Sequence, residues 1–320
     1  MAIRRLLLFN MEEFYRYTNR KTNAIFGQLC VAIYAFNTGY VIYKRPDLYN
    51  SFKKIFYRLL KFLIGYWIIC FAFLIYGLAT SAQLPEFKIF LTNLIGLNVS
   101  AKVNYINVAH AWYVTYYIIL LMGGAFWFQK LFSRSILITD CLILLLSITI
   151  LPLLPSSITK IIWPITSTFV GLFVCKYHLF EKIENITNRK GYLVELTVIL
   201  FLMFTSFLIK FYLWNLNAWG RFDGFYAFMI ILAITLMYKY IPNIIVKTIR
   251  GIGSLGMFYW FIHSIFVVGN REFLNVLYWP YFPPLITIWG IVLVTIPVLV
   301  TNTISEKIFV WSKRMIDKIF

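Results

Sequence analysis

The ionisable side chains that could do chemistry in this chain are few, and most of them lie within or beside long apolar runs. Asp140, Glu195, Lys210, Asp223 and His263 all have this setting. Polar side chains are costly inside a bilayer and commonly mark substrate pathways, ion pathways or proton relays. We therefore take these five residues as the first functional candidates.

His263 lies near the middle of its apolar run. A histidine titrates near neutral pH, so it could give or take a proton during a reaction. A histidine that packs a helical bundle through a hydrogen bond would show the same pattern, and both interpretations stay open. No second histidine, cysteine or carboxylate stands at metal-ligand spacing from it, which argues against a metal site.

Arg58 and Lys61 stand one helical turn apart where another apolar run begins. Two cations on one helix face could bind the phosphates of a soluble donor such as a nucleotide or a coenzyme. Alternatively, both side chains could extend to the phosphates of membrane lipids. The sequence alone leaves these two interpretations open.

His110, Trp112 and Tyr113 stand at the start of a further run. Tryptophan and tyrosine at such a place usually form an interfacial aromatic belt.

The elements that must position these residues follow from the composition. Of 320 residues, 61% are hydrophobic, 20% are aromatic and 13% are charged, whereas about 25% of the residues in a soluble domain are charged. Apolar runs of roughly 17–22 residues recur along the chain, which is the length that a helix needs to cross a bilayer. The runs do not alternate as the strands of a membrane barrel would. We therefore expect an all-α, polytopic transmembrane bundle that forms one domain over residues 1–320.

About nine spans are expected, with one shorter apolar piece over residues 87–98 that re-enters the membrane or lies at its surface. The expected spans cover residues 24–43, 59–80, 111–129, 135–155, 161–176, 191–213, 222–239, 252–270 and 284–305.

The basic residues predict the orientation of these spans. The net charge of +18 comes from residues between the apolar runs and does not form a soluble basic patch, which argues against nucleic acid as a partner and favours membrane lipids. Eighteen of the 30 lysines and arginines fall in alternate inter-span segments that begin with residues 44–58, and five fall in the other inter-span segments. Because basic loops stay in the cytoplasm, we assign the first set to the cytoplasmic side. Five more lie in residues 1–23 and do not fit this scheme.

Four stretches resemble the acyltransferase 3 family of integral membrane acyltransferases. They are FGQLCVAIYAFNTGYVIYK, FKKIFYRLLKFLIGYW, HAWYVTYYIILLM and IGSLGMFYWFIHSIF, which begin at Phe26, Phe52, His110 and Ile252. The second resembles the Arg-x-x-Arg region of the family, with Lys61 in place of the second arginine. The four follow the family's order over nearly the whole chain.

This resemblance implies transfer of an acyl group, commonly acetyl, from cytoplasmic acyl-CoA to a hydroxyl of a carbohydrate or lipid-linked saccharide of the cell envelope. It implies a multi-pass protein of the cell membrane. On this basis we assign Arg58 and Lys61 to CoA binding and expect Trp112 and Tyr113 to line the path of the acceptor. His263 is the one histidine left within an expected span, so it is the candidate catalytic residue, for site packing or proton handling. No metal is expected as a cofactor.

The beginning of the chain departs from the family pattern. Family members start with a span that ends in one or two histidines, one of which is thought to be the catalytic base. Residues 1–9 resemble the end of that span, with Arg4 and Arg5 at the histidine positions. Arginine stays protonated and cannot act as a base. Residues 1–23 are thus expected to be a remnant of a first span or a tail, in a truncated or inactive member.

A polytopic transporter, such as a flippase of a lipid-linked glycan, is the alternative from another class. It would also be apolar, basic and aromatic. Transporters often contain inverted repeats and paired broken helices, and the sequence shows neither. An inactive relative that binds a partner is a third interpretation.

The charge count predicts that residues 44–58 and the C-terminal tail share the cytoplasm. Asn50→Cys and Asp317→Cys, each made with the four native cysteines replaced by alanine, should react with a membrane-impermeant thiol reagent only after the cells are opened. Labelling of either cysteine in intact cells would contradict the assignment.

Overall fold

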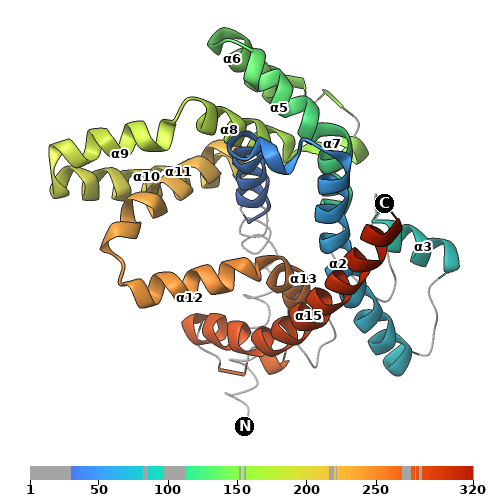
Figure 1. Cartoon of the computed structure of the whole chain (residues 1–320). Coiled ribbons are helices and arrows are strands. Elements are labelled where there is room, and N and C mark those ends of the chain that lie inside the picture. Colours follow the sequence, from blue (N-terminus) through green and yellow to red (C-terminus); the bar gives the residue numbers. More distant parts are fainter. Residues whose placement is uncertain are drawn as a thin grey trace. The chain divides into compact units, whose positions relative to one another are not determined.

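The computed structural model is helical throughout nearly all of the chain that it describes (Figure 1). Of the described residues, 91% are helical and none forms a strand, which confirms the all-α fold class. The described residues are 30–81, 86–96, 112–150, 153–154, 156–215, 220, 222–268, 275–277, 279–280 and 283–319. The opening segment with Arg4 and Arg5 lies outside them, as does His110.

The chain divides into two compact units, each described here by itself: unit 1, Met1–Pro46 and Phe128–Tyr240, and unit 2, Asp47–Trp127 and Ile241–Phe320. Unit 1 contains a helix over residues 30–44 and then α6 (Leu137–Ile150), α7 (Ser156–Ile162), α8 (Ile165–Lys176), α9 (Leu179–Lys190), α10 (Tyr192–Asn215), α11 (Asp223–Met237) and η4 (Tyr238–Tyr240). Unit 2 contains α2 (Phe52–Ser81), α3 (Phe87–Ile95), α4 (Trp112–Ile119), the π-helical turn η2 (Leu120–Gly124), α12 (Asn243–Ser254), α13 (Gly256–Val268) and α15 (Pro283–Ile319). The short helix η1 (Pro46–Leu48) and α5 (Ala125–Arg134) carry the chain from one unit to the other.

Four of these helices are long and apolar enough to cross a membrane, so the chain is a membrane protein with several spanning helices. The stretches are Phe52–Ala72, Tyr192–Lys210, Asp223–Tyr240 and Ile288–Lys318. Two shorter apolar helices, Leu137–Ile150 and Ile165–Lys176, fall below this length. The expectation of about nine spans stays a prediction.

Several boundaries differ from those expected. The segment expected to span over residues 161–176 is divided at Trp163 and Pro164, where α7 ends and α8 begins, because a proline cannot continue the hydrogen bonding of the preceding helix. The expected span 252–270 is likewise two helices, which meet at Leu255. In contrast, α15 continues for 37 residues, so it is about 55 Å long and exceeds the roughly 30 Å thickness of hydrocarbon.

In unit 1 the helix over residues 30–44 packs closely on α8 through two glycines. A Cβ atom at Gly39 would lie 2.0 Å from the carbonyl oxygen of Thr168, and one at Gly171 would lie 2.1 Å from the carbonyl oxygen of Phe36. The Thr168 hydroxyl donates a hydrogen bond of 3.2 Å to a backbone carbonyl of the facing helix. Small residues let helix backbones approach in this way where the hydrophobic effect is weak.

Helices α10 and α11 form an antiparallel pair in unit 1, and α9 lies against both (Figure 1). Their buried core consists of Ile199 from α10 and Leu232, Ala233 and Leu236 from α11. Phe180 of α9 is among the apolar side chains that pack against this core. Amphipathic α9 therefore covers the pair at one end.

In unit 2 the first turns of α2 contact the last turns of α15 (Figure 1). Asp317 accepts a 2.6 Å hydrogen bond from the Tyr57 hydroxyl and lies 2.9 Å from the Lys53 ammonium. The start of α2 and the end of α15 therefore lie on the same side of any membrane that both helices cross, as the charge count requires. Which side this is stays a prediction.

The short apolar piece expected over residues 87–98 is the nine-residue helix α3, which is too short to cross a bilayer. Gly96 ends it in the left-handed conformation, with φ of 74°, which glycine adopts without steric cost. The Trp67 indole of α2 donates a 2.6 Å hydrogen bond to the carbonyl of Leu94. This bond fastens α3 to α2.

Candidate functional site

Aromatic side chains from α2, α4 and α13 meet in unit 2. The ring centroids of Tyr66 and Phe261 are 5.5 Å apart, which joins α2 to α13. Tyr113 of α4 lies 5.1 Å from Trp260 of α13, with the two rings perpendicular. Three of the stretches that carry the family resemblance are therefore in contact, although they are far apart in the chain.

Phe62 and Tyr117 extend this aromatic cluster towards the start of α2. Their ring centroids are 4.5 Å apart, and Phe62 also lies 6.3 Å from Phe261. Arg58, Phe62 and Tyr66 follow one another at intervals of four residues, so the three side chains lie on one face of α2. Arg58 thus lies at the end of the face that carries the aromatic cluster.

Arg58 is held by the short segment that precedes α2. Its guanidinium carbon lies 4.7 Å from the ring centroid of Tyr49, and a guanidinium nitrogen donates a hydrogen bond to the Tyr49 hydroxyl. Burial raises the pKa of the Tyr49 phenol, and the positive charge of Arg58 offsets part of that rise. The phenol therefore stays neutral at physiological pH, and its ring provides a fixed support for the guanidinium.

Lys61, the second predicted phosphate ligand, has a different partner. Its ammonium lies 2.7 Å from a carboxylate oxygen of Glu306 on α15, and both side chains are about half exposed. The two cations expected to act together are thus directed to different elements, Arg58 to the segment before α2 and Lys61 to α15. Their predicted role in CoA binding is not tested by these contacts.

His263 lies one turn beyond Trp260 and Tyr259 on α13 and is half-buried. Its Nδ1 is 3.1 Å from the carbonyl oxygen of Tyr259. A carbonyl only accepts hydrogen bonds, so the neutral ring carries its proton on Nδ1 and the lone pair on Nε2. The Tyr259 hydroxyl and Thr295 of α15 are 2.7 Å apart, which fixes the same turn of α13.

The predicted acceptor-path residues stand at the start of α4. Tyr113 is buried, with 5% of its surface exposed, and its ring contacts are described above. Trp112 is the first residue of the helix, and its side chain lies outside the described part. Tyr113 is therefore a packing residue of the aromatic cluster, whatever else it contacts.

A π-helical turn, η2, follows α4 directly and was not expected from the sequence. Such turns occur mostly as single insertions within α-helices and frequently lie at functional sites. The Gly123-Gly124 pair was the available signal, since glycine lowers the cost of irregular backbone. A Cβ atom at Gly123 would meet nothing within 4 Å, so that residue is not required by close packing.

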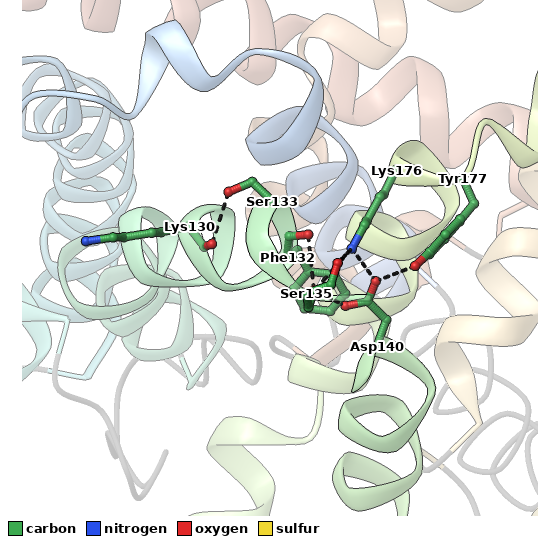
Figure 2. A network of polar contacts seen from close by, with 7 residues as sticks. All are labelled: Lys130, Phe132, Ser133, Ser135, Asp140, Lys176 and Tyr177. Carbon is green, nitrogen blue, oxygen red and sulfur yellow. Dashed lines mark hydrogen bonds and ion pairs between the residues drawn. The ribbon is translucent and has the colours of Figure 1, made fainter. Parts of the chain in front are cut away.

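A second polar site lies in unit 1 around Asp140 (Figure 2). This carboxylate lies in the first turn of α6 and is fully buried. One of its oxygens accepts a hydrogen bond from the Ser135 hydroxyl. The other accepts a hydrogen bond of 2.7 Å from the Tyr177 hydroxyl. The Lys176 ammonium lies 2.5 Å from the second oxygen and also donates to the carbonyl of Ser135 at 2.7 Å. Burial and the Asp140 hydrogen bond raise the pKa of Tyr177 to about 12, so its phenol remains a donor at neutral pH.

The other two buried carboxylates also lie against lysines. Asp223 of α11 pairs with Lys210 of α10, and Glu195 of α10 lies 2.5 Å from the ammonium of Lys239. All three buried acids that the sequence offered as functional candidates are thus ion-paired. One oxygen of Asp223 and one of Glu195 have no hydrogen-bond partner within the described part of unit 1. No cluster of three or more potential metal ligands is found among the described residues.

Compared with models of known protein families, with curated proteins and with solved structures, the chain has no significant match.

The Asp140 network predicts strong coupling between the buried partners. Asp140→Asn should lower the free energy of unfolding by roughly 3–5 kcal/mol, because it leaves the Lys176 charge uncompensated away from water. Combining it with Lys176→Gln should cost much less than the sum of the single changes. Denaturant unfolding of the purified chain in detergent measures all three variants.

The exposed pair of Lys53 and Asp317, with side chains 50% and 42% exposed, provides the matched control. Lys53→Gln should change the unfolding midpoint little, because exposed ion pairs are well screened. Additive effects of the two changes at Asp140 and Lys176 would show that the buried pair does not act as a unit.

Proposed function

We propose that this chain is an acyltransferase of the acyltransferase 3 type in the cell membrane. In this proposal it moves an acyl group, acetyl in the simplest case, from acyl-CoA to a hydroxyl of an envelope carbohydrate or lipid-linked saccharide. The observation that carries the proposal is the contact of α2, α4 and α13 in one aromatic cluster. These helices bear three stretches that resemble the family, with Arg58 at one end of the cluster.

In the proposed reaction, Arg58 binds phosphate oxygens of the donor. A guanidinium can form two parallel hydrogen bonds to one phosphate, and the Tyr49 ring beneath it limits its motion. Lys61 contributes less, since it shares its charge with Glu306. Trp112 and Tyr113, at the start of α4, line the approach of the acceptor.

The transfer needs a base, because a sugar hydroxyl is a weak nucleophile at neutral pH. Arg4 and Arg5 stand where the family has its base and cannot serve, because arginine stays protonated. In this proposal the role falls instead to Nε2 of His263, which carries the lone pair of the neutral ring. The acceptor hydroxyl gives its proton to this nitrogen while its oxygen attacks the thioester carbon. The carbon–sulfur bond then breaks, and the CoA thiolate takes up the proton as the ester is released.

A transporter of lipid-linked glycans is the second candidate, and one observation favours it. Lys210 and Asp223 form a buried ion pair between two helices long enough to span, and one Asp223 oxygen lacks a partner within the described part. Intramembrane charge pairs of this kind are common in ion and proton pathways. A transporter would bind its glycan without requiring acyl-CoA.

The acyltransferase proposal predicts that Arg58→Ala weakens binding of acetyl-CoA by about 10–100-fold, since a charge-assisted phosphate contact contributes roughly 1.5–3 kcal/mol. Lys61→Ala should have a smaller effect. Isothermal titration of the purified full chain in nanodiscs measures the dissociation constants.

Lys54→Ala is the matched control for Arg58→Ala. It removes one positive charge a single turn earlier on α2, where the Lys54 ammonium donates to the Asp47 carbonyl and to the Asn50 side chain in the segment before α2. Its affinity for acetyl-CoA should equal that of the wild type. Unchanged binding by a folded Arg58→Ala variant would assign Arg58 to lipid phosphates and remove the main support for the donor site.

A further inference from the structure

Helix α12 of unit 2 has a sharply divided surface. Asn243, Lys247, Arg250 and Ser254 follow one another at intervals of four, three and four residues, so they form a polar stripe along one face. Ile245, Ile249 and Ile252 follow the same helical spacing on the opposite face. The helix is therefore amphipathic along its whole length.

The apolar face of α12 is not covered by the described part of unit 2. Within the helix only Val246 is buried, while Ile245, Ile249 and Ile252 are 46%, 58% and 43% exposed. Ile244, beside this face, is 71% exposed. A row of exposed isoleucines on a helix that continues into an apolar helix requires an apolar surface to cover it.

We propose that α12 lies in the plane of the bilayer surface and binds anionic lipids. Its isoleucines would enter the boundary between headgroups and acyl chains, and Lys247 and Arg250 would contact lipid phosphates. Amphipathic helices with lysine and arginine on the polar face bind membranes in this way, and each nearby cation adds to the attraction of an anionic leaflet.

The position of α12 in the chain supports a lipid rather than a protein partner. It ends at Ser254, and after the single residue Leu255 the chain continues as α13 with the apolar sequence GMFYWFIHSIFVV. The break between the two helices lets α12 change direction where the chain meets the apolar phase. Its basic residues belong to the set that the charge count assigns to the cytoplasmic leaflet, where anionic lipids concentrate. This inference does not depend on acyl transfer.

Nitroxide labels on the full chain test the orientation of α12. Ile249→Cys and Ser254→Cys are labelled separately, with the native cysteines replaced by alanine, and placed in vesicles of phosphatidylcholine and phosphatidylglycerol. The label at position 249 should collide with oxygen and be shielded from a water-soluble nickel reagent, and the label at position 254 should show the reverse. Equal exposure of both to nickel would overturn the proposal, and so would a label at 249 that is shielded from both reagents, since protein would then cover the face.

The role of the basic stripe is tested with the Lys247→Gln, Arg250→Gln double variant. In the wild type, adding phosphatidylglycerol to phosphatidylcholine vesicles should shift the label at position 249 deeper. The double variant should lose this shift, whereas Lys182→Gln combined with Arg189→Gln on α9 should retain it. A shift that persists in the first variant would show that α12 does not bind the anionic headgroups.

Discussion

The three carboxylates that the described helices bury are each held against a lysine of another element, because an isolated charge away from water costs several kcal/mol. Asp140 lies against Lys176, Glu195 against Lys239 and Asp223 against Lys210. Each pair joins the end of one helix to the end of its neighbour. The pairs thereby fix the position of α6 along α8 and the position of α10 along α11. If one helix of such a pair slid along the other by one turn, the paired charges would separate.

Unit 2 is held by different contacts, and the candidate site depends on them. Half-exposed ion pairs lie between the start of α2 and the end of α15, while its interior is aromatic. Tyr66, Phe261, Tyr113 and Trp260 fix α2, α4 and α13 against one another. The same contacts determine that Arg58 and His263 belong to one cluster of helices, and the acyltransferase proposal stands on this arrangement. The Tyr49 ring supports the guanidinium of Arg58 at the end of this cluster.

Much of the helical architecture could be predicted from the lengths of the apolar runs. The prediction that residues 44–58 and the C-terminal tail lie on the same side of the membrane agrees with the contacts of Asp317 with Tyr57 and Lys53. The division of the expected spans into two helices at Pro164 and at Leu255 was not predicted, because hydropathy averages over short interruptions. The sequence singled out Asp140, yet it could not reveal Lys176 as its partner, because that contact depends on which helices are neighbours. For the same reason Arg58 and Lys61 were expected on one shared site, whereas tertiary contacts give them separate partners.

The central claim is that acyl-CoA binds at the cluster formed by α2, α4 and α13. The most direct measurement is photocrosslinking of the purified full chain with a CoA thioester that carries a diazirine on its acyl chain, followed by mass spectrometry of the labelled peptides. Labelling should fall on residues of α2, α4 and α13 and should disappear when excess acetyl-CoA is added. Labelling confined to the helices of unit 1, or labelling that acetyl-CoA does not reduce, would contradict the account.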